Sequence, residues 1–400
     1  MRVLELIFGF QLGSRAGGIL RFSTELSRAL IQRGFDIHLG GLFDFGTPIE
    51  KDILLQLRTE GIDAFCAAEW NDCFPQYSFC QAVRALWDWQ SCYRAKIIHS
   101  HSEFSDVAAL ILKFHPTRPF VVRTVHYPFR KEWRKRPLRR ILLTNLFYPL
   151  LFDSEVGINQ TITDRLNSRF LSKILRRRAL CIYNAIDLNR FRRPVDRKSK
   201  RESLNIPNDA PLVGTIGRLT EQKGFSFLID AIPIVLKERP DVHFIIVGDG
   251  ELSEPLRRLT ISHGVNHRVV FTGPRSDIEE IFACLDLFVL PSLWEGLPTV
   301  ILESMAANVP VVATDIPGTR DLIRDGYNGW LVPPGNAYAL AEAILDALKN
   351  DQLSKIFAQR AQNLVTTFSI DSVAKQYEQL FLSLVLNPQV KGRLFICPKG

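Results

Sequence analysis

The feature that most constrains the fold is an alternation of short apolar segments with helical segments, which occurs in both halves of the chain. The apolar segments begin at Val3, Gly34, Ala95, Phe120, Pro211, Val242, Val269 and Val309. Strands that alternate with helices are typical of a parallel, doubly wound sheet. Because 400 residues exceed one ordinary hydrophobic core, we expect two such α/β domains.

Composition narrows the class of protein. Hydrophobic residues make up 46% of the chain and charged residues 23%, which indicates a globular protein. An uninterrupted apolar run of membrane-spanning length is not found, so no transmembrane helix is predicted. The first ten residues contain Glu5 and read as a buried strand, not a signal peptide. The 7 cysteines are scattered without a CxxC pair, which predicts neither disulfides nor zinc and indicates a cytoplasmic location.

Positive charge is concentrated in the first half. Residues 118–178 hold fifteen Lys and Arg against four Asp and Glu, whereas the whole chain carries +8. A basic surface of this kind predicts a phosphate-rich partner, either an anionic lipid, a lipid-linked diphosphate or a nucleic acid. Nucleic-acid binding is disfavoured because no RNA- or DNA-binding motif accompanies the charge.

Residues 127–152 interleave bulky apolar side chains with Lys and Arg. The apolar members are Phe129, Trp133, Leu138, Ile141, Leu142, Leu143 and Leu146; the basic ones are Arg130, Lys131, Arg134, Lys135, Arg136, Arg139 and Arg140. Such a segment can lie in a membrane interface, which predicts peripheral contact with the inner face of the cytoplasmic membrane. A core helix with a solvated basic face is the alternative.

The stretch Leu290–Glu303 holds the main candidate site. An apolar strand ends in a Pro-Ser turn, a loop carries Glu295, and a helix is expected from Thr299, with Glu303 about one turn inside it. A helix N-terminus can hold a phosphate, and a carboxylate can accept hydrogen bonds from two sugar hydroxyls. This combination suits a nucleotide sugar, although either Glu alone could be a solvated or capping carboxylate.

Two further loops suit phosphate binding. Arg218 and Lys223 follow a Gly-containing strand five residues apart, where they could neutralise a diphosphate without a metal ion. A Gly-rich loop ending in Gly17 and Gly18 lies between the first strand and the first helix. This loop matches neither GxGxxG nor a P-loop, and a simple tight turn is an equal alternative.

Glu295 and Glu303, with Gly296-Leu297-Pro298 between them, resemble the E-x7-E motif of the retaining glycosyltransferases of family 4. The resemblance extends over about residues 1–387 through Gly17-Gly18, the segment Cys181–Phe191, Arg218 with Lys223, and the Gly248 turn. The chain departs from the family pattern at three positions. They are Asn159 in place of Ser, Ala185 in place of Gly, and Asp321 in place of Glu.

The resemblance implies the GT-B fold, with two Rossmann-like domains facing a cleft. It places an acceptor-side domain at 1–191, a linker at 192–208, a nucleotide-sugar-binding domain at 209–369 and a tail at 388–400. A final helix at 370–387 is expected to cross back to the first domain.

The resemblance also implies site roles. Glu303 would hold the ribose, Arg218 and Lys223 the diphosphate, and Glu295 with the backbone of Gly296 and Leu297 the sugar hydroxyls. Backbone groups near Gly17, Gly18, Gly217, Gly248 and Arg275 would contact the donor. His126 would support the sugar from the first domain, although a lone His after a strand is often structural; His101 is a weaker candidate. Neither a cofactor nor a metal ion is expected.

The expected reaction moves a sugar, with retention, from a nucleotide sugar to a glycan or polyprenyl-linked acceptor in polysaccharide synthesis. UDP-sugars are favoured as donors. A soluble acceptor, a catalytically silent GT-B subunit and a nucleotide-sugar epimerase are the alternatives.

Overall fold

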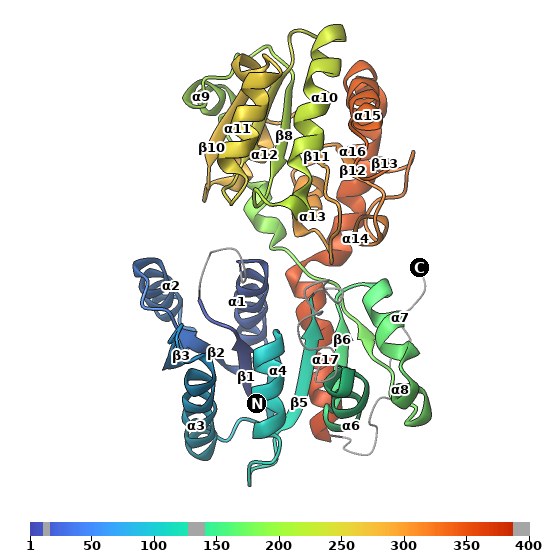
Figure 1. Ribbon diagram of the computed structural model, residues 1–400. Coiled ribbons are helices and arrows are strands. Elements are labelled where there is room, and N and C mark those ends of the chain that lie inside the picture. Colours follow the sequence, from blue (N-terminus) through green and yellow to red (C-terminus); the bar gives the residue numbers. More distant parts are fainter. Residues whose placement is uncertain (11–16, 127–140, 387–400) are drawn as a thin grey trace. The chain divides into compact units, whose positions relative to one another are not determined.

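The computed structural model describes residues 1–10, 17–126 and 141–386, which form two compact units (Figure 1). The first unit comprises Met1–Asn184 together with the chain from Ile370, and the second comprises Ala185–Ser369. The final helix, α17 (Ile370–Leu386), therefore belongs to the first unit although it follows the second in sequence.

The first unit is built on a parallel sheet with the strand order β3-β2-β1-β4-β5-β6-β7. Its strands are β1 (Arg2–Ile7), β2 (Asp36–Asp44), β3 (Asp63–Glu69), β4 (Ile97–Ser100), β5 (Phe120–Val125), β6 (Ser154–Gly157) and β7 (Leu180–Cys181). Besides α17, its helices are α1 (Gly17–Gln32), α2 (Pro48–Thr59), α3 (Pro75–Tyr93), α4 (Glu103–Leu112), the π-helix η2 (Leu143–Phe147), α6 (Tyr148–Leu151), α7 (Gln160–Ser168) and α8 (Phe170–Ile174).

Both faces of this sheet are covered by helices, and β1 shows how. Leu4 and Leu6 join a buried cluster that contains residues of α3 and α4, whereas Ile7 joins a cluster with residues of α1. Successive side chains of a strand point to opposite faces, so Glu5 lies on the same face as Ile7. A carboxylate on that strand is therefore fully buried and needs polar partners.

The second unit has a parallel sheet with the order β10-β9-β8-β11-β12-β13. Its strands are β8 (Leu212–Ile216), β9 (His243–Val247), β10 (Val269–Gly273), β11 (Leu287–Leu290), β12 (Val311–Thr314) and β13 (Trp330–Val332). Its α-helices are α9 (Arg197–Ser203), α10 (Phe225–Glu238), α11 (Ser253–Ser262), α12 (Ile278–Cys284), α13 (Thr299–Ala306), α14 (Pro317–Arg320), α15 (Ala337–Lys349) and α16 (Asp351–Val365).

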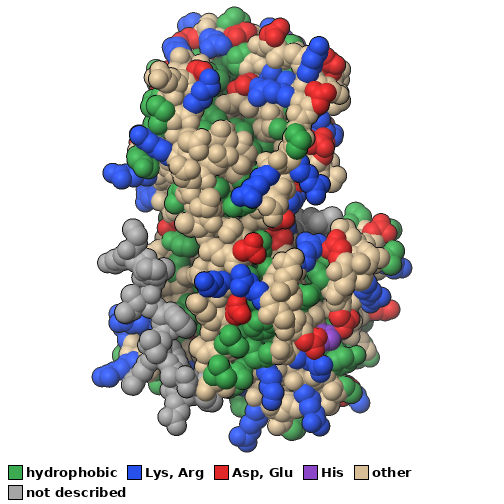
Figure 2. Space-filling model, turned by 180° about the vertical axis from the view of Figure 1, so that it is seen from behind, with side chains coloured by type: hydrophobic (Ala, Val, Ile, Leu, Met, Phe, Trp, Pro, Cys, Tyr) green, Lys and Arg blue, Asp and Glu red, His purple; other side chains and the backbone are tan. Residues whose placement is uncertain are grey.

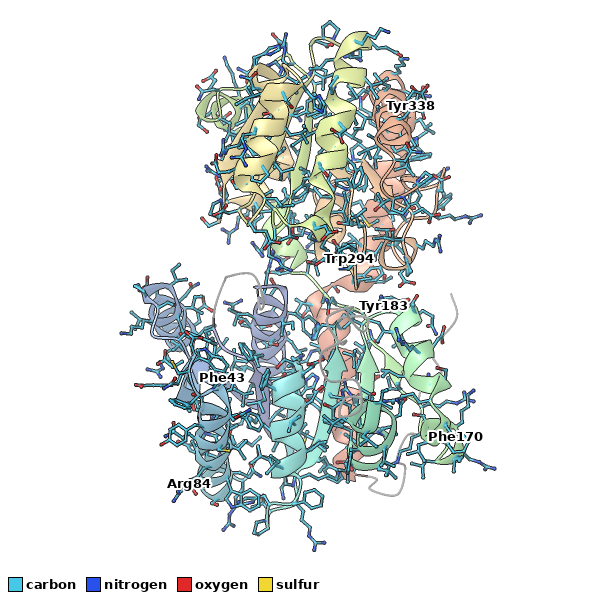
Figure 3. All side chains as sticks on the ribbon, in the orientation of Figure 1. Phe43, Arg84, Phe170, Tyr183, Trp294 and Tyr338 are labelled. Atoms are coloured by element: carbon cyan, nitrogen blue, oxygen red, sulfur yellow. The ribbon has the colours of Figure 1, made fainter. Side chains whose placement is uncertain are left out.

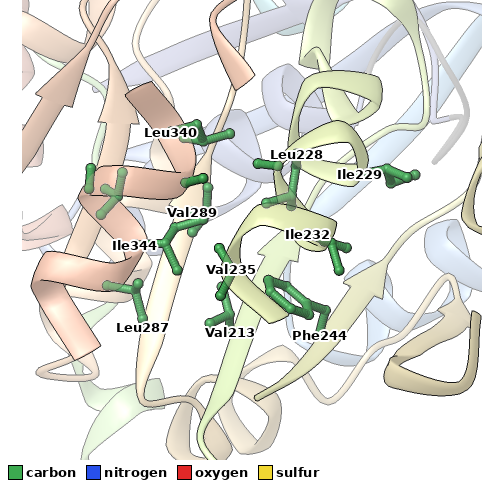
Figure 4. Close-up of a cluster of buried hydrophobic side chains, with 14 of the residues drawn as sticks. Val213, Leu228, Ile229, Ile232, Val235, Phe244, Leu287, Val289, Leu340 and Ile344 are labelled. Atoms are coloured by element: carbon green, nitrogen blue, oxygen red, sulfur yellow. The ribbon is translucent and has the colours of Figure 1, made fainter. Parts of the chain in front are cut away.

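A hydrophobic core fills the space between this sheet and helices α10 and α15 (Figure 4). Ile232 and Val235 of α10, Ile344 of α15, Phe244 of β9 and Val289 of β11 are among its buried members. The two helices pack side by side. This core fixes β8 and β11 as neighbours, and the two loops that follow these strands carry the candidate site.

The predicted fold class is confirmed, since each unit is a parallel, Rossmann-like sheet covered by helices. The expected linker at 192–208 differs from the structure because it contains helix α9 within the second unit. Lys200 of α9 pairs with Asp277 and with Glu280, and Arg197 pairs with Asp286. These ion pairs account for the charges of Arg197 and Lys200 in this segment.

Candidate active site

The candidate site of the second unit lies where the strand order reverses. β8 is flanked by β9 on one side and β11 on the other, so the chain turns in opposite directions after β8 and β11. In open α/β sheets, the loops outside the carboxyl ends of such strands form the ligand site. Here these loops carry Gly217, Arg218 and Lys223 after β8, and Glu295 after β11.

Glu295 and Lys223 meet directly. Lys223 Nζ lies 2.6 Å from Glu295 Oε1, and the Ser292 hydroxyl donates to the same oxygen at 2.7 Å. Gln222 Nε2 donates to Glu295 Oε2 at 3.3 Å and to the carbonyl oxygen of Trp294 at 3.0 Å. The Glu295 side chain is therefore held in one orientation by donors from both loops, as a binding group must be.

The loop that holds Glu295 is anchored on its other side by β12 and α14. Thr314 Oγ1 donates to the Ser292 carbonyl at 2.5 Å, and Thr319 Oγ1 donates to the Thr314 carbonyl at 2.5 Å. Gly318 lies so close that an added Cβ would be 2.5 Å from the Gly296 carbonyl oxygen. Trp294, labelled in Figure 3, is 45% exposed beside these buried groups. The backbone of this loop is therefore held on both sides, while the ring of Trp294 stays exposed.

Gly217 and Gly248 bring two further loops together. Gly248 has φ +133°, and a Cβ built on it would lie 1.9 Å from the Gly217 carbonyl oxygen. The Gly217 amide donates to Val247 at 3.0 Å, and the Gly248 amide donates to Gly273 at 2.9 Å. A Cβ on Gly217 would lie 3.4 Å from Lys223 Cε. The loops after β8, β9 and β10 are thus in contact, and Gly217, one of the predicted glycines, lies beside Lys223.

The other predicted residues of this unit take different positions. Glu303 lies inside α13, as expected, and is buried, while Leu297 is also buried. The Arg275 guanidinium forms two hydrogen bonds with Asp277, at 2.7 and 2.5 Å. These bonds, with the ion pair from Lys200, hold the pKa of Asp277 well below its usual range. The Arg275 side chain is therefore occupied outside the group around Glu295.

In the first unit, the corresponding reversal lies between β1 and β4, and the predicted residues Gly17 and Gly18 follow β1. Helix α1 begins at Gly17, and a Cβ added to Gly18 would meet nothing within 4 Å. Residues 11–16 of the Gly-rich loop lie outside the described part. His126 directly follows β5 and is buried. Its Nε2 lies 3.1 Å from His101 Nδ1, so the two histidines named from the sequence are neighbours.

Sequence reasoning missed several polar residues of the two units. Ser292 and Gln222 bond to Glu295, and Glu5 and His99 lie behind His101. A signal existed for the second pair, because His99 and His101 are spaced by two along a strand and Glu5 interrupts an apolar one. No local sequence pattern marks Ser292 or Gln222. Their partner, Glu295, is distant in sequence from Gln222 and is reached from Ser292 through a turn.

Two Rossmann-like units, one with a carboxylate–lysine pair at its topological switch point, define a two-unit α/β enzyme architecture. Family models agree: Glycosyltransferase Family 4 matches residues 16–190, and Glycosyl transferases group 1 matches residues 196–364. The chain belongs to the family 4-type glycosyltransferases with the GT-B fold.

Individual relatives agree with this assignment. The lipopolysaccharide core biosynthesis glycosyltransferase LpsE of Rhizobium meliloti is 39% identical over 184 residues, which cover 46% of this chain and 53% of that protein. The UDP-Gal:alpha-D-GlcNAc-diphosphoundecaprenol alpha-1,3-galactosyltransferase of Escherichia coli is 26% identical and covers 73% of this chain and 76% of its own length. The crystal structure of Anabaena HepE in complex with UDP has a TM-score of 0.79 at 23% identity, covering 96% of this chain and 100% of that one.

Proposed function

We propose that this glycosyltransferase moves a sugar from a nucleotide-diphosphate sugar, a UDP-sugar in the favoured case, to a glycan or lipid-linked acceptor in cell-surface polysaccharide synthesis. The observation that carries the proposal is the Lys223–Glu295 pair at the carboxyl ends of β8 and β11. This pair places a cation, which can bind a phosphate, next to a carboxylate, which can bind sugar hydroxyls. The name of the Escherichia coli relative, a transferase with a UDP-sugar donor and a diphosphoundecaprenol acceptor, supports both substrate classes.

The proposed chemistry retains the anomeric configuration. The bond between the anomeric carbon and the diphosphate oxygen breaks, and the acceptor hydroxyl oxygen bonds to that carbon on the same face. The hydroxyl proton passes to the leaving diphosphate. Arg218 and Lys223 stabilise the charge that develops on the diphosphate, as donors in an oxyanion site do. Glu295 holds sugar hydroxyls, Glu303 holds the ribose, and neither a metal ion nor a protein nucleophile takes part.

The surface of the first unit supports the proposal of a lipid-linked acceptor. Phe147, Leu150, Phe170 and Ile174, on η2, α6 and α8, are 43%, 41%, 76% and 58% exposed. In Figure 2, hydrophobic side chains reach the surface of this unit among Lys and Arg side chains. Among the described helices, none is long and apolar enough to cross a membrane. We propose peripheral contact with the inner face of the cytoplasmic membrane, where a polyprenyl-linked acceptor would be available.

The test combines binding and transfer. Purified protein is screened by thermal shift against UDP, GDP and ADP and their sugars, and transfer is measured with and without EDTA. Lys223→Ala should lower transfer by about 100-fold or more, because a charge at the leaving group is lost. Lys237→Ala, which removes an exposed lysine at the other end of α10, is the matched control and should transfer normally.

Two results would contradict the proposal. An unaltered rate in Lys223→Ala would remove this residue from the site, and loss of all transfer in EDTA would contradict the metal-free reaction. A wild-type protein that binds no nucleotide at all would instead favour a silent GT-B subunit.

A further inference from the structure

A chain of buried polar side chains runs along one face of the first sheet. In the register of the parallel strands, Glu5 of β1 lies beside His99 of β4. His101 and His126 directly follow the carboxyl ends of β4 and β5. Strand register therefore brings one carboxylate and three imidazoles together, and all four are at least nine-tenths buried.

The hydrogen bonds of this chain are continuous. Glu5 Oε2 lies 2.6 Å from His101 Nε2, and His101 Nδ1 lies 3.1 Å from His126 Nε2. On the other side, Glu5 Oε1 lies 3.1 Å from His99 Nδ1, and His99 Nε2 lies 2.7 Å from Thr124 Oγ1. Each of these buried rings therefore has a hydrogen-bond partner at one nitrogen or at both.

The protonation of Glu5 sets the direction of these bonds. Burial acts to raise the pKa of the Glu5 carboxyl, but the charge of His99 and hydrogen bonds from His101 and His99 outweigh it and lower the pKa to about 2. An ionised carboxylate only accepts hydrogen bonds. His101 Nε2 and His99 Nδ1, which both contact Glu5, must therefore each carry a proton.

The protonation of His101 in turn determines which ring nitrogen of His126 carries the proton. Burial, together with the charge of His99, lowers the pKa of His101 to about 4, so the ring is neutral at pH 7. With its proton on Nε2, His101 Nδ1 has a lone pair and accepts. His126, whose pKa is also lowered by burial, must donate from Nε2. Its Nδ1 is then the unprotonated nitrogen.

We propose that Glu5 is a positioning residue that, through His101, fixes His126 in the tautomer with the proton on Nε2 and a hydrogen-bond acceptor at Nδ1. The acceptor nitrogen fits a hydroxyl group of a sugar and disfavours the diphosphate of a nucleotide sugar, which is fully ionised at neutral pH and has no proton to donate. This assignment of ligand class rests on the proposed glycosyl transfer. The fixing of the tautomer does not, because it follows from contacts within the first unit.

A metal ion is the competing explanation for the cluster. One ligand atom each from Glu5, His99 and His101 lie within 4.8 Å of one another. The same atoms are already joined by hydrogen bonds at 2.6 to 3.1 Å, which satisfy the carboxylate without a cation. The direct bonds therefore favour a positioning role, and zinc titration belongs in the test.

The first measurement is the tautomer of His126 in the wild-type full chain at pH 7. Two-bond ¹H–¹⁵N spectra of imidazole-labelled protein separate protonated from unprotonated ring nitrogens, and the His126 signals are identified by their loss in His126→Gln. The proposal requires the proton on Nε2. A proton on Nδ1, or a stoichiometric shift of the His99 and His101 signals upon addition of Zn²⁺, would overturn it.

The second measurement uses Glu5→Gln, which keeps the shape of the side chain. Its amide can donate to His101 Nε2, which would move the His101 proton to Nδ1 and the His126 proton to Nδ1 as well. We expect this inversion in the spectrum and a fall in kcat of about tenfold or more, with KM for the donor changed by about twofold or less. An unchanged His126 tautomer in this variant would overturn the proposal. If the variant does not fold, the wild-type spectrum decides alone.

Asp153→Asn is the matched control. Asp153 is another buried carboxylate of this unit, bonded to Lys113 Nζ at 2.6 Å and to the Val121 amide at 2.9 Å. Its loss should lower stability and leave the His126 tautomer as it is. If the wild-type protein binds and transfers no sugar, the proposed function fails while the spectrum still decides whether Glu5 fixes His126.

Discussion

Gly248 shows how closely two loops approach each other in the candidate site. Its φ of +133° is one that other residues rarely adopt, and an added Cβ would lie 1.9 Å from a backbone oxygen of Gly217. The backbone oxygen cannot rotate away as the end of a side chain could. A glycine is therefore required at this position both because of its φ angle and because there is no room for a Cβ.

Gly248→Ala is expected to destabilise the second unit by on the order of 3 kcal/mol or more, because the β8 and β9 loops must separate. Chemical denaturation, with nucleotide binding measured in parallel, checks this value. Gly264→Ala is the control within the same unit: its φ is +67° but nothing lies within 4 Å of an added Cβ. It should cost only about 1–2 kcal/mol for the left-handed conformation. Equal losses of unfolding free energy in the two variants would show that the contact between the loops does not contribute to stability.

At the scale of single residues, the sequence could name groups but not their partners. Glu295 and Lys223 were both expected to bind the donor, each to a different part of it, yet in the structure they bond to each other. In the proposed site, the substrate would therefore insert between them or share their bonds. Glu5 was read only as a polar interruption of a strand, because the histidines that make its burial tolerable are far away in sequence.

At the scale of elements, α8 and α6 form an exposed apolar surface beside basic residues. Arg177 Nη1 donates to the carbonyl oxygens of Pro149, Leu150 and Phe152, which joins the segment after α8 to the end of α6. Phe170, labelled in Figure 3, projects from α8 and is 76% exposed. Exposed apolar side chains next to basic ones are typical of interfacial binding to anionic lipids.

We expect the wild-type protein to float with vesicles that contain anionic lipid and to stay unbound with purely zwitterionic ones. Phe170→Ser with Ile174→Ser should reduce flotation several-fold, since apolar area inserted into the interface is lost. Tyr338→Ser, which removes an exposed ring of the second unit, is the control and should leave flotation unchanged. Binding that is equal for both lipid types would exclude the electrostatic contribution. The larger part of the expected segment, residues 127–140, lies outside the described residues.

Elements with strong periodicity were predictable. Helix α17 ends one residue before the expected range of 370–387, and α13 begins at Thr299 as its turn residues indicate. The segment 192–208 contains helix α9, whose Arg197 and Lys200 pair with Asp277, Glu280 and Asp286 far along the chain. Charge composition alone cannot distinguish a solvated segment from one held by ion pairs.

At the scale of the whole molecule, the buried cluster of Glu5 and the histidines and the proposed donor site lie in different units. His101, His126 and Glu5 belong to the first unit, whereas Lys223 and Glu295 belong to the second. Each unit has its own hydrophobic core. A molecule of this kind need not unfold in one step. Acid and nucleotide are therefore expected to act on different parts of it.

The sign of the acid effect follows from the histidines. Burial lowers the pKa of His101 from 6.5 to about 4, so the unfolded chain takes up the proton first as the pH falls. The first unit thus loses stability between about pH 6.5 and pH 4, by about 3 kcal/mol for this ring. His126 acts in the same direction. Asp106, whose pKa burial raises to about 6 against the opposing charge of Arg123, acts in the opposite direction and offsets part of the loss.

Scanning calorimetry should therefore show two transitions that respond separately. Lowering the pH from 7.5 to 5 should move the transition of the first unit to lower temperature. The second unit, whose His243 also has a pKa lowered by burial, should move less. UDP at about 100 times its dissociation constant should raise the transition of the second unit by a few degrees, because binding adds roughly 2.7 kcal/mol. His101→Asn should weaken the pH response of the first transition alone. A single transition that moves with both pH and UDP would contradict this prediction, because it would mean that the two units unfold together. The effects of pH and of UDP would then have to be separated by substitutions within each unit.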